Sequence, residues 1–290
     1  MDWPVSVALA QSVQTLPVAH DLHYEPKFDG HRLVMWRLEE TVRLQTRSGR
    51  DATAVWLDLA VAGMQLPAGV VLDGEGIVYV AGRVDFSAAQ SRANSSPARA
   101  RLLAERHPAH YAAFDVLHHP EHGDVRSWSY VRRRALLERL LEEYGMGPPI
   151  QAVPTTTDAD LARAWYESLQ AQGVEGLVIK TGSSTYRGGS RQWRKLRHSE
   201  TVDAAVVGFT GPPMRPRHLA VRLPDGRVAL SQRLSAPLAA QVAPRLVVAG
   251  TGRRARTRSG DAYTAVETDI VVEVQAGTTR HAVVTVTRLR

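Results

Sequence analysis

The distribution of charge divides this chain into two parts. Residues 1–200 hold 23 basic and 23 acidic side chains, whereas residues 201–290 hold 13 basic and 6 acidic ones. The whole formal net charge of +7 therefore lies in the last 90 residues. Because a single core rarely grows to this length, the division predicts two domains, 1–199 and 200–290, with a boundary near His198-Ser199-Glu200. A basic second part favours a nucleic-acid partner, and a solubilising surface explains the charge equally well.

The apolar pattern predicts a different architecture for each part. In the first, alternating residues at 33–38 and 41–46 predict a β-hairpin, and helical periodicity appears at 87–106, 130–144 and 158–172. We therefore expect an α+β domain with antiparallel sheets. In the helix at 130–144, we expect Val131, Leu137, Leu141 and Tyr144 to share the buried face and the arginines to face solvent.

The second part contains short alternating segments and one helix-like stretch at 237–248. The segments expected to form strands are 204–209, 218–223, 227–234, 262–275 and 281–287. This content predicts a small, all-β Greek-key barrel of the OB type. The arginine-rich run 252–258 lies between these elements, where we expect a loop.

Composition excludes several classes of protein. Hydrophobic residues make up 44% and charged residues 22%, which excludes wholesale disorder. No apolar run is long enough to cross a bilayer, and Met1-Asp2-Trp3-Pro4 lacks the basic segment of a secretory signal. The absence of cysteine excludes disulfides and thiolate metal sites. We therefore expect a cytoplasmic protein without a membrane partner.

Only three of the 36 basic residues are lysine: Lys27, Lys180 and Lys195. Arginine supplies a fixed cation but cannot lose a proton to become a nucleophile, so each lysine is a candidate for special chemistry. Lys27 lies in the string Glu25-Pro26-Lys27-Phe28-Asp29-Gly30-His31-Arg32, which predicts a loop entering the hairpin. Gly30 would allow close backbone approach there, and the nearby Arg32 favours a neutral amine that can attack phosphorus.

Five further strings follow this one. They are Thr46-Arg47-Ser48-Gly49-Arg50, Leu72-Asp73-Gly74-Glu75, Ala113-Phe114-Asp115-Val116-Leu117, Val174-Glu175-Gly176-Leu177-Val178-Ile179-Lys180 and Trp193-Arg194-Lys195-Leu196-Arg197. In this order the six strings resemble the nucleotidyltransferase motifs of the ATP-dependent DNA ligases. The small bacterial ligases, which consist of an adenylation domain and an OB-fold, are the most similar. The resemblance runs from about Glu25 to Arg197 and weakens toward the end of the chain.

The resemblance implies a role for each matching residue around the nucleotide. Lys27 would be the nucleophile that takes AMP as a phosphoramidate. Glu25 would contact the adenine amino group, and Phe114 would stack on the purine. Arg32 and Glu75 would hold the ribose and order the loop that carries the lysine.

The resemblance also implies the contacts with phosphate, metal and DNA. Arg47 would lie near the AMP and the nick, and Lys180 and Lys195 would bind the α-phosphate. Glu175 would bind the divalent metal, Mg²⁺ or Mn²⁺, with ATP as co-substrate. The partner would be nicked duplex DNA, contacted by the arginines Arg191, Arg253, Arg254, Arg256 and Arg258. We expect a monomer associated with the nucleoid, acting in DNA repair or recombination.

Two departures from the family pattern stand out. Arg197 occupies a position where the family usually has lysine, which keeps the charge but changes the hydrogen-bonding geometry. The C-terminal family motif, which helps to orient the departing pyrophosphate, is hard to find. The nearest string, from Arg280-His281-Ala282 to Arg288-Leu289-Arg290, contains no carboxylate and no lysine. Only Arg280, Arg288 and Arg290 would then meet the pyrophosphate, which predicts slow self-adenylation.

Several alternatives stay open. An RNA ligase or a capping guanylyltransferase would share the fold, and a degenerate C-terminus would suit a non-catalytic module that binds DNA ends. Asp29, Asp73 and Asp115 fit structural or supporting roles better than direct metal binding. A zinc site at the histidines around Pro120 lacks a further cluster of ligands; they are His118, His119 and His122.

Overall fold

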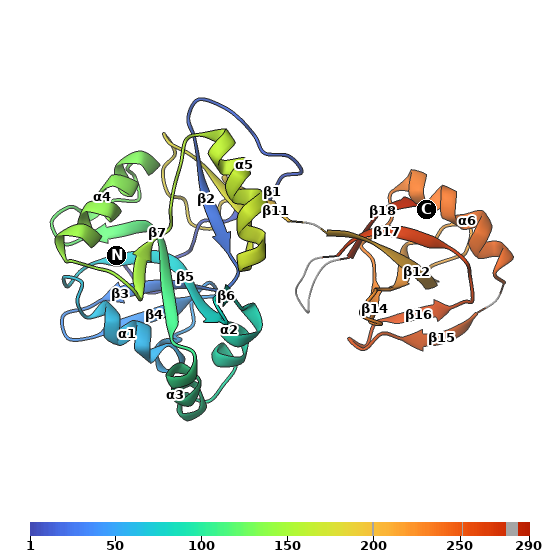
Figure 1. Ribbon diagram of the computed structural model, residues 1–290, viewed down its shortest axis with the longest axis horizontal. Helices are drawn as coiled ribbons and strands as arrows, with labels where there is room; N and C mark the ends of the chain where they lie inside the picture. The colour runs from blue at the N-terminus through green and yellow to red at the C-terminus, as the bar shows by residue number, and fades with distance from the viewer. Residues whose placement is uncertain (199, 251, 277–283) are drawn as a thin grey trace. The chain divides into compact units, whose positions relative to one another are not determined.

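The computed structural model describes residues 1–198, 200–250, 252–276 and 284–290. The chain divides into two compact units, Met1–His198 and Ser199–Arg290 (Figure 1). Each unit has buried apolar clusters of its own. Of the C-terminal string, Arg280, His281 and Ala282 lie outside the described residues.

The larger sheet of the first unit has the order β4-β3-β5-β7-β8, with β6 beside β5 and β9 beside β7. Its strands are β3 (His31–Arg37), β4 (Val42–Thr46), β5 (Val71–Val80), β6 (Arg83–Val84), β7 (Ala109–His119), β8 (Gly123–Asp124) and β9 (Ile150–Ala152). Strands β3 and β4 confirm the expected hairpin. Neighbouring strands are antiparallel except for β9, which runs parallel to β7.

A second, four-stranded sheet has the order β1-β11-β10-β2. Its strands are β1 (Ala10–Ser12), β2 (Leu22–Phe28), β10 (Val174–Thr181) and β11 (Trp193–Arg197). Lys27 lies within β2, so the expectation of a loop at this residue is wrong. The strand continues through Phe28 because β10 pairs with it along its length, which leaves only Asp29 and Gly30 between β2 and β3.

Helices cover both sheets of this unit, with α4 beside β7 and α5 beside β2 (Figure 1). The helices are α1 (Leu57–Gly63), α2 (Phe86–Ala93), α3 (Pro97–Arg106), α4 (Tyr130–Glu143) and α5 (Ala159–Ser168), with 3-10 turns η1 (Thr53–Val55) and η2 (Leu169–Gln172). They confirm the three expected helical regions. Side-chain oxygens of Asp85, Ser96 and Asp158 cap the N-termini of α2, α3 and α5. No helix in the described part of the chain is long and apolar enough to cross a membrane.

Helix α4 buries charged residues that were expected to face solvent. Arg133 has no exposed surface, and its guanidinium donates to the two carboxylate oxygens of Asp115 at 2.7 and 3.0 Å. Conversely, Val131 and Tyr144 are 45% and 42% exposed. The expected burial pattern was therefore wrong on these points, because a carboxylate on a distant strand supplies the partner that a buried arginine needs.

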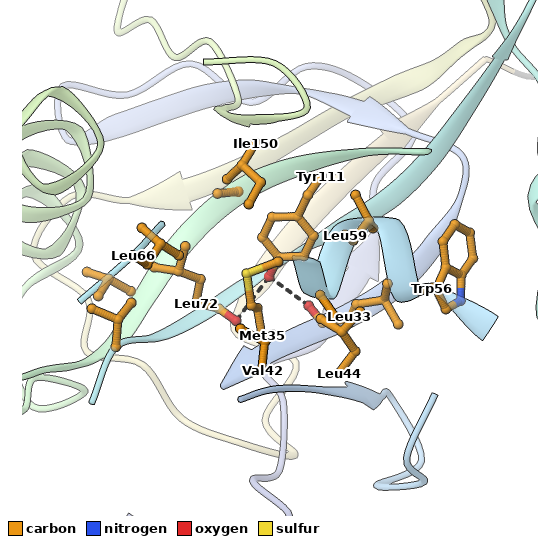
Figure 2. Close-up of a cluster of buried hydrophobic side chains, with 14 of the residues drawn as sticks. Leu33, Met35, Val42, Leu44, Trp56, Leu59, Leu66, Leu72, Tyr111 and Ile150 are labelled. Carbon is orange, nitrogen blue, oxygen red and sulfur yellow. Dashed lines mark hydrogen bonds between the residues drawn. The ribbon is translucent and has the colours of Figure 1, made fainter. Parts of the chain in front are cut away.

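Tyr111 is buried in the apolar core that packs against the larger sheet (Figure 2). Its hydroxyl donates to the carbonyl oxygens of Leu33 at 2.9 Å and of Leu72 at 3.0 Å. The ring lies directly against Gly74, where a Cβ atom would come within 2.5 Å of the Tyr111 Cζ atom. Gly74 is thus required for packing between β5 and β7.

The second unit is a sheet-rich body with one helix. The elements are β12 (Glu200–Thr210), β13 (His218–Arg222), β14 (Val228–Leu230), α6 (Ala236–Val248), β15 (Arg253–Arg256), β16 (Ala262–Ala265), β17 (Val271–Ala276) and β18 (Val284–Leu289). The long strand β12 pairs with β13, β16 and β17, so it connects the whole sheet. Leu246 of α6 packs into the same apolar cluster as Leu219 and Val272.

Two expectations for this unit were wrong. Residues 253–256 form the edge strand β15, paired with β16, where a loop was expected. The segment 262–275 is divided between β16 and β17, which pair with different stretches of β12. Of the expected strand 281–287, residues 281–283 lie outside the described residues.

Candidate active site

A cavity of about 1080 Å³ lies in the first unit, lined by strands of both sheets. All the site candidates that the sequence analysis assigned to this unit line it: Glu25, Lys27, Arg32, Arg47, Glu75, Phe114, Glu175, Lys180, Arg191 and Lys195. These residues are spread over 171 positions of the chain, and the two sheets bring them to one place.

Three neighbouring strands position Lys27, the candidate nucleophile. Gly176 on β10 is paired with Lys27 on one side and with Arg197 on the other. The Lys27 ammonium forms an ion pair with one carboxylate oxygen of Glu175, and Arg197 Nε lies 2.7 Å from the other. Glu175 therefore already attracts two cations of the chain.

A β-bulge at Glu175 shapes this arrangement. The register of β10 against β2 shifts between Val174 and Gly176. Gly176 has φ +148, and a Cβ atom there would lie 2.0 Å from the Leu196 carbonyl oxygen. Only glycine fits this close backbone approach.

Two further carboxyl groups, Asp29 and Glu75, line the cavity around Lys27. Burial raises the pKa of Asp29 to about 6, and the nearby charge of Glu175 adds to the effect. Burial also raises the pKa of Glu75 to about 7, although the charges of Lys27 and Arg32 oppose the shift. Near neutral pH, both groups therefore change protonation state within reach of the candidate nucleophile.

Arg32 is held rigidly in the wall of the cavity. Its Nε donates to Asp73 at 2.9 Å, and the Tyr186 hydroxyl donates to the other Asp73 oxygen at 2.6 Å. The guanidinium carbon lies 5.1 Å from the ring centroid of Phe114 and 5.2 Å from that of Trp193. Arg32 thus supports the Phe114 ring through a cation–π contact as well as presenting charge.

Glu25 and Lys180 form an ion pair deep in the cavity. Lys180 Nζ lies 3.0 and 2.9 Å from the two oxygens of Glu25, and it also donates to the Phe114 carbonyl at 2.8 Å. The Tyr130 hydroxyl donates to Glu25 at 2.6 Å. Burial lowers the pKa of the Lys180 ammonium, and the Glu25 charge opposes this. The structure therefore pairs Lys180 with Glu25, and its contact with the α-phosphate, which the resemblance implied, stays a prediction.

Basic side chains remain at the more open part of the cavity. Lys195 is half-buried, and burial lowers its pKa, helped by the positive charges of Arg197 and Lys27. Arg47 and Arg191 line the cavity and are exposed to solvent. A phosphate-bearing ligand in the cavity would therefore meet several cationic side chains.

The second unit carries the other DNA-binding candidates. Arg253, Arg254, Arg256 and Arg258 are all exposed, the first three on β15 and the last in the following turn. Because side chains alternate along a strand, Arg254 and Arg256 share one face and Arg253 lies on the other. Arg256 also donates to the Gly260 carbonyl at 2.7 Å.

Arg288 and Arg290 are engaged within their own unit. Both lie within 2.8 Å of the Glu273 carboxylate, and Arg290 Nε is 2.8 Å from Asp203. To meet a pyrophosphate, as the sequence analysis expected, they would have to leave these partners.

Sequence reasoning missed several residues that line the cavity or support its lining. Tyr130, Tyr186 and Trp193 fix Glu25, Asp73 and Phe114, respectively. The rings of His31 and Phe86 stack with 3° between their planes and 6.0 Å between centroids. Trp193 and His31 lie within the motif strings, so their place in the sequence could have identified them as residues that line the cavity. Nothing in the sequence marks Tyr130, Tyr186 or Phe86.

The cavity thus brings together Lys27 beside Glu175, the aromatic ring of Phe114 and several cationic side chains. These are the groups that a nucleotidyltransferase site needs. Residues 7–197 match the family model described as ATP dependent DNA ligase domain. The chain therefore belongs to the ATP-dependent DNA ligase family, which confirms the resemblance seen in its motifs.

Named relatives agree with this membership. DNA ligase C2 of Mycolicibacterium smegmatis is 34% identical over 207 residues, which is 71% of this chain and 57% of that protein. DNA ligase C of Mycobacterium tuberculosis is 34% identical over 209 residues, 71% of this chain and 58% of that protein. This chain thus matches somewhat less than two thirds of the length of these relatives.

Solved structures share the fold. The ligase domain of Mycobacterium tuberculosis LigD superposes with a TM-score of 0.59 at 23% identity, covering 98% of this chain and 94% of that one. A structure from work on Lig E DNA ligases gives a TM-score of 0.60 at 20% identity, covering 99% and 100%. At these identities the likeness shows a mixed helix-and-sheet fold of the ligase type and nothing about substrate.

Proposed function

We propose that this chain is an ATP-dependent DNA ligase that seals nicks in duplex DNA through a lysyl-AMP intermediate on Lys27. The observation that carries the proposal is the position of Lys27, whose amine lies in a large cavity among Glu175, Asp29 and Glu75. Residues 1–199 would act as the adenylation domain. Residues 200–290 would act as an OB-fold domain, supported by the long strand β12, which pairs with both β13 and β17, and by α6, which packs into the apolar cluster of these strands.

The first step would form the covalent intermediate. The neutral amine of Lys27 attacks the α-phosphorus of ATP, the N–P bond forms, and the bond to the pyrophosphate oxygen breaks. The amine loses its proton in this step, and the ionised forms of Asp29 and Glu75 are acceptors in its surroundings. Lys195 and Arg47, which line the same cavity, would neutralise charge on the phosphates.

The next two steps would use the DNA. An oxygen of the 5′-phosphate at the nick attacks the same phosphorus, and the N–P bond to Lys27 breaks. The 3′-hydroxyl then attacks the 5′-phosphorus, a phosphodiester forms and AMP leaves. Arg191 on the first unit, and Arg253, Arg254, Arg256 and Arg258 on the second, would contact DNA phosphates. A cytoplasmic, nucleoid-associated monomer would suit this substrate.

Glu175 fits a divalent metal such as Mg²⁺ or Mn²⁺. Its carboxylate lines the cavity and already holds two cationic groups, and such ions need few protein carboxylates because phosphate oxygens and water complete their shell. When bound, the ion would supply positive charge to the phosphate oxygens during transfer.

The base would be selected deeper in the cavity. Phe114 would stack on the purine, held in place by Arg32 and Trp193. Glu25 has a carboxylate oxygen lone pair left after its bonds to Lys180 and Tyr130, and this would accept the adenine amino group. Lys180 would therefore act as a positioning residue for Glu25.

Labelling with α-³²P-ATP or α-³²P-GTP, followed by denaturing electrophoresis, tests the proposal. We expect a labelled protein band with ATP, its loss in Lys27→Arg, and joining of a nicked duplex by the labelled wild type. Arg163→Lys, which adds an exposed lysine on α5, is a matched control that should label like the wild type.

The other outcomes identify the alternatives. Labelling with GTP would favour a guanylyltransferase, and joining of nicked RNA in preference to DNA would favour an RNA ligase. A wild-type chain that binds DNA ends but takes no label would be a non-catalytic end-binding module. Label retained by Lys27→Arg would remove Lys27 as the nucleophile.

A further inference from the structure

The turn between β7 and β8 gathers three potential metal ligands. His119 is the last residue of β7, Glu121 and His122 follow in the turn, and one ligand atom from each lies within 4.8 Å of the others. Strand pairing of His119 with Gly123 folds the turn back over His119. Among the residues that the structure describes, this is the one group of three such side chains found so close together.

A hydrogen bond to the His119 ring leaves its Nδ1 atom unprotonated and therefore able to bind a metal ion. Its Nδ1 atom accepts a long hydrogen bond, 3.2 Å, from the backbone N–H of Glu121. The lone pair of Nδ1 therefore faces the turn, and in the neutral ring the proton is on Nε2. A metal ion at Nδ1 would replace this weak bond without first removing a proton from that nitrogen.

The second histidine is also restrained. The rings of His119 and His122 are stacked, with centroids 4.9 Å apart and 23° between the planes. The other neighbour of His122 is Trp128, at 5.3 Å between centroids. His119 is only 8% exposed, while Glu121 and His122 are open to solvent, so water could complete the coordination shell.

His118 does not belong to this group, although its position in the sequence suggested it. Its Nδ1 atom is bonded to the carbonyl oxygen of Gly69 at 2.6 Å. Successive side chains on a strand point to opposite faces, so His118 and His119 diverge. The turn supplies Glu121 in its place, a ligand that the sequence analysis had not included.

We propose that His119, Glu121 and His122 bind one transition-metal ion, of the Zn²⁺, Co²⁺ or Ni²⁺ class. Two imidazoles and one carboxylate suit these ions, whereas Mg²⁺ prefers oxygen ligands alone. This site is separate from the cavity, because none of its residues lines it. His119 lies five residues beyond Phe114 on β7, about 17 Å along the strand. The bound ion ties the end of this strand to its turn and stabilises the first unit.

Metal titration of the chelator-treated protein tests the proposal. Zn²⁺ added in competition with a chromophoric chelator should bind with one tight equivalent, and Co²⁺ should give a visible absorption band. We expect His122→Gln and Glu121→Gln each to weaken Zn²⁺ binding at least about tenfold. Both residues are exposed, so these variants should fold, and unchanged circular dichroism would establish this.

Two controls separate this site from other histidines and from the catalytic carboxylate. His20→Gln removes an exposed histidine elsewhere and should leave Zn²⁺ binding unchanged. Glu175→Gln should also retain the tight equivalent, and millimolar Mg²⁺ should not displace it. Wild-type affinity in the folded His122→Gln variant, or loss of the tight equivalent in Glu175→Gln, would overturn the assignment, whatever the outcome of the ATP-labelling experiment.

Discussion

Replacement of Lys180 by methionine tests whether this lysine holds Glu25 in place. Glu25 is 2% exposed and Lys180 1%, and the ammonium nitrogen lies 3.0 and 2.9 Å from the two carboxylate oxygens. Methionine keeps most of the aliphatic length and removes the charge. Glu25 would then be a buried carboxylate without its main cation.

The contacts of Glu25 set limits on how far Lys180→Met lowers the free energy of unfolding. Removing one partner of a buried ion pair costs about 3–5 kcal/mol. The variant can limit this loss by protonating Glu25, and holding an ordinary glutamate neutral at pH 7.5 costs about 4 kcal/mol. The Tyr130 hydroxyl still donates to Glu25 at 2.6 Å. We expect Lys180→Met to lose about 3–4 kcal/mol at pH 7.5 and about 1 kcal/mol at pH 5, where protonation is easier.

Urea unfolding followed by tryptophan fluorescence measures this loss in the intact chain. All six tryptophans lie in residues 1–198, so the signal reports the first unit alone. The matched variant is the double substitution Glu25→Gln with Lys180→Met, which removes both charges and keeps an acceptor for Tyr130. We expect the double variant to be at least about 2 kcal/mol more stable than Lys180→Met.

The single variant Glu25→Gln completes a double-mutant cycle. If the free-energy losses of the two single variants add up to the loss of the double variant, the two charges do not interact and the reasoning is refuted. Kinetics distinguish the role in binding. If Lys180 positions Glu25, Lys180→Met should raise the KM for ATP far more than it lowers kcat of self-adenylation. A selective fall in kcat would instead indicate that Lys180 contacts the α-phosphate.

Three further predictions concern charge. Burial raises the pKa of Glu75 to about 7 from 4.5, so its ionisation destabilises the folded state as pH rises between these values. Glu75→Gln should therefore melt higher than the wild type at pH 8, with no gain below about pH 4.5; a pH-independent difference would contradict this. Arg197 is half-exposed and forms an ion pair with Glu175, where it would compete with Mg²⁺. Arg197→Gln should therefore lower the Mg²⁺ concentration for half-maximal self-adenylation about two- to fivefold. A higher Mg²⁺ requirement in this variant would argue against such competition. Neutralising the four second-unit arginines should reduce the slope of log K for nick binding against log salt by up to about 3–4, and an unchanged slope would mean that they touch no phosphate; the substitutions are Arg253→Gln, Arg254→Gln, Arg256→Gln and Arg258→Gln.

Local sequence was enough to predict much of the cavity. The six strings named its lining because each combines a charged residue with a strand-forming flank, and strands carry their side chains to a defined face. The hairpin of β3 and β4 and the helices α2 to α5 followed from periodicity and capping residues. The strand at Lys27 did not, since the charged string before the hairpin suggested a loop and only pairing with the distant β10 extends β2 through Phe28.

Pairings between distant residues were the part that the sequence could not reveal. Arg133 looked like a surface residue because its partner, Asp115, lies 18 positions away on another element. The ion pair of Lys180 with Glu25 was equally hidden, because it spans 155 positions. In both cases the charge type was visible in the sequence, and the partner was a consequence of the fold.

The contact between Tyr111 and Gly74 limits which substitutions the segment beside this cavity can accept during evolution. Gly74 stands between Asp73, which holds Arg32, and Glu75, which lines the cavity, and both the Tyr111 ring and the Ala112 carbonyl oxygen exclude a side chain there. A lineage with a larger residue at 74 would therefore need both a smaller residue at 111 and a shift of the β7 backbone at Ala112. Such a lineage would give up the hydroxyl that joins the backbones of β3 and β5. The segment from Asp73 to Glu75 is therefore constrained by the packing of the neighbouring strand β7 as well as by the cavity beside it.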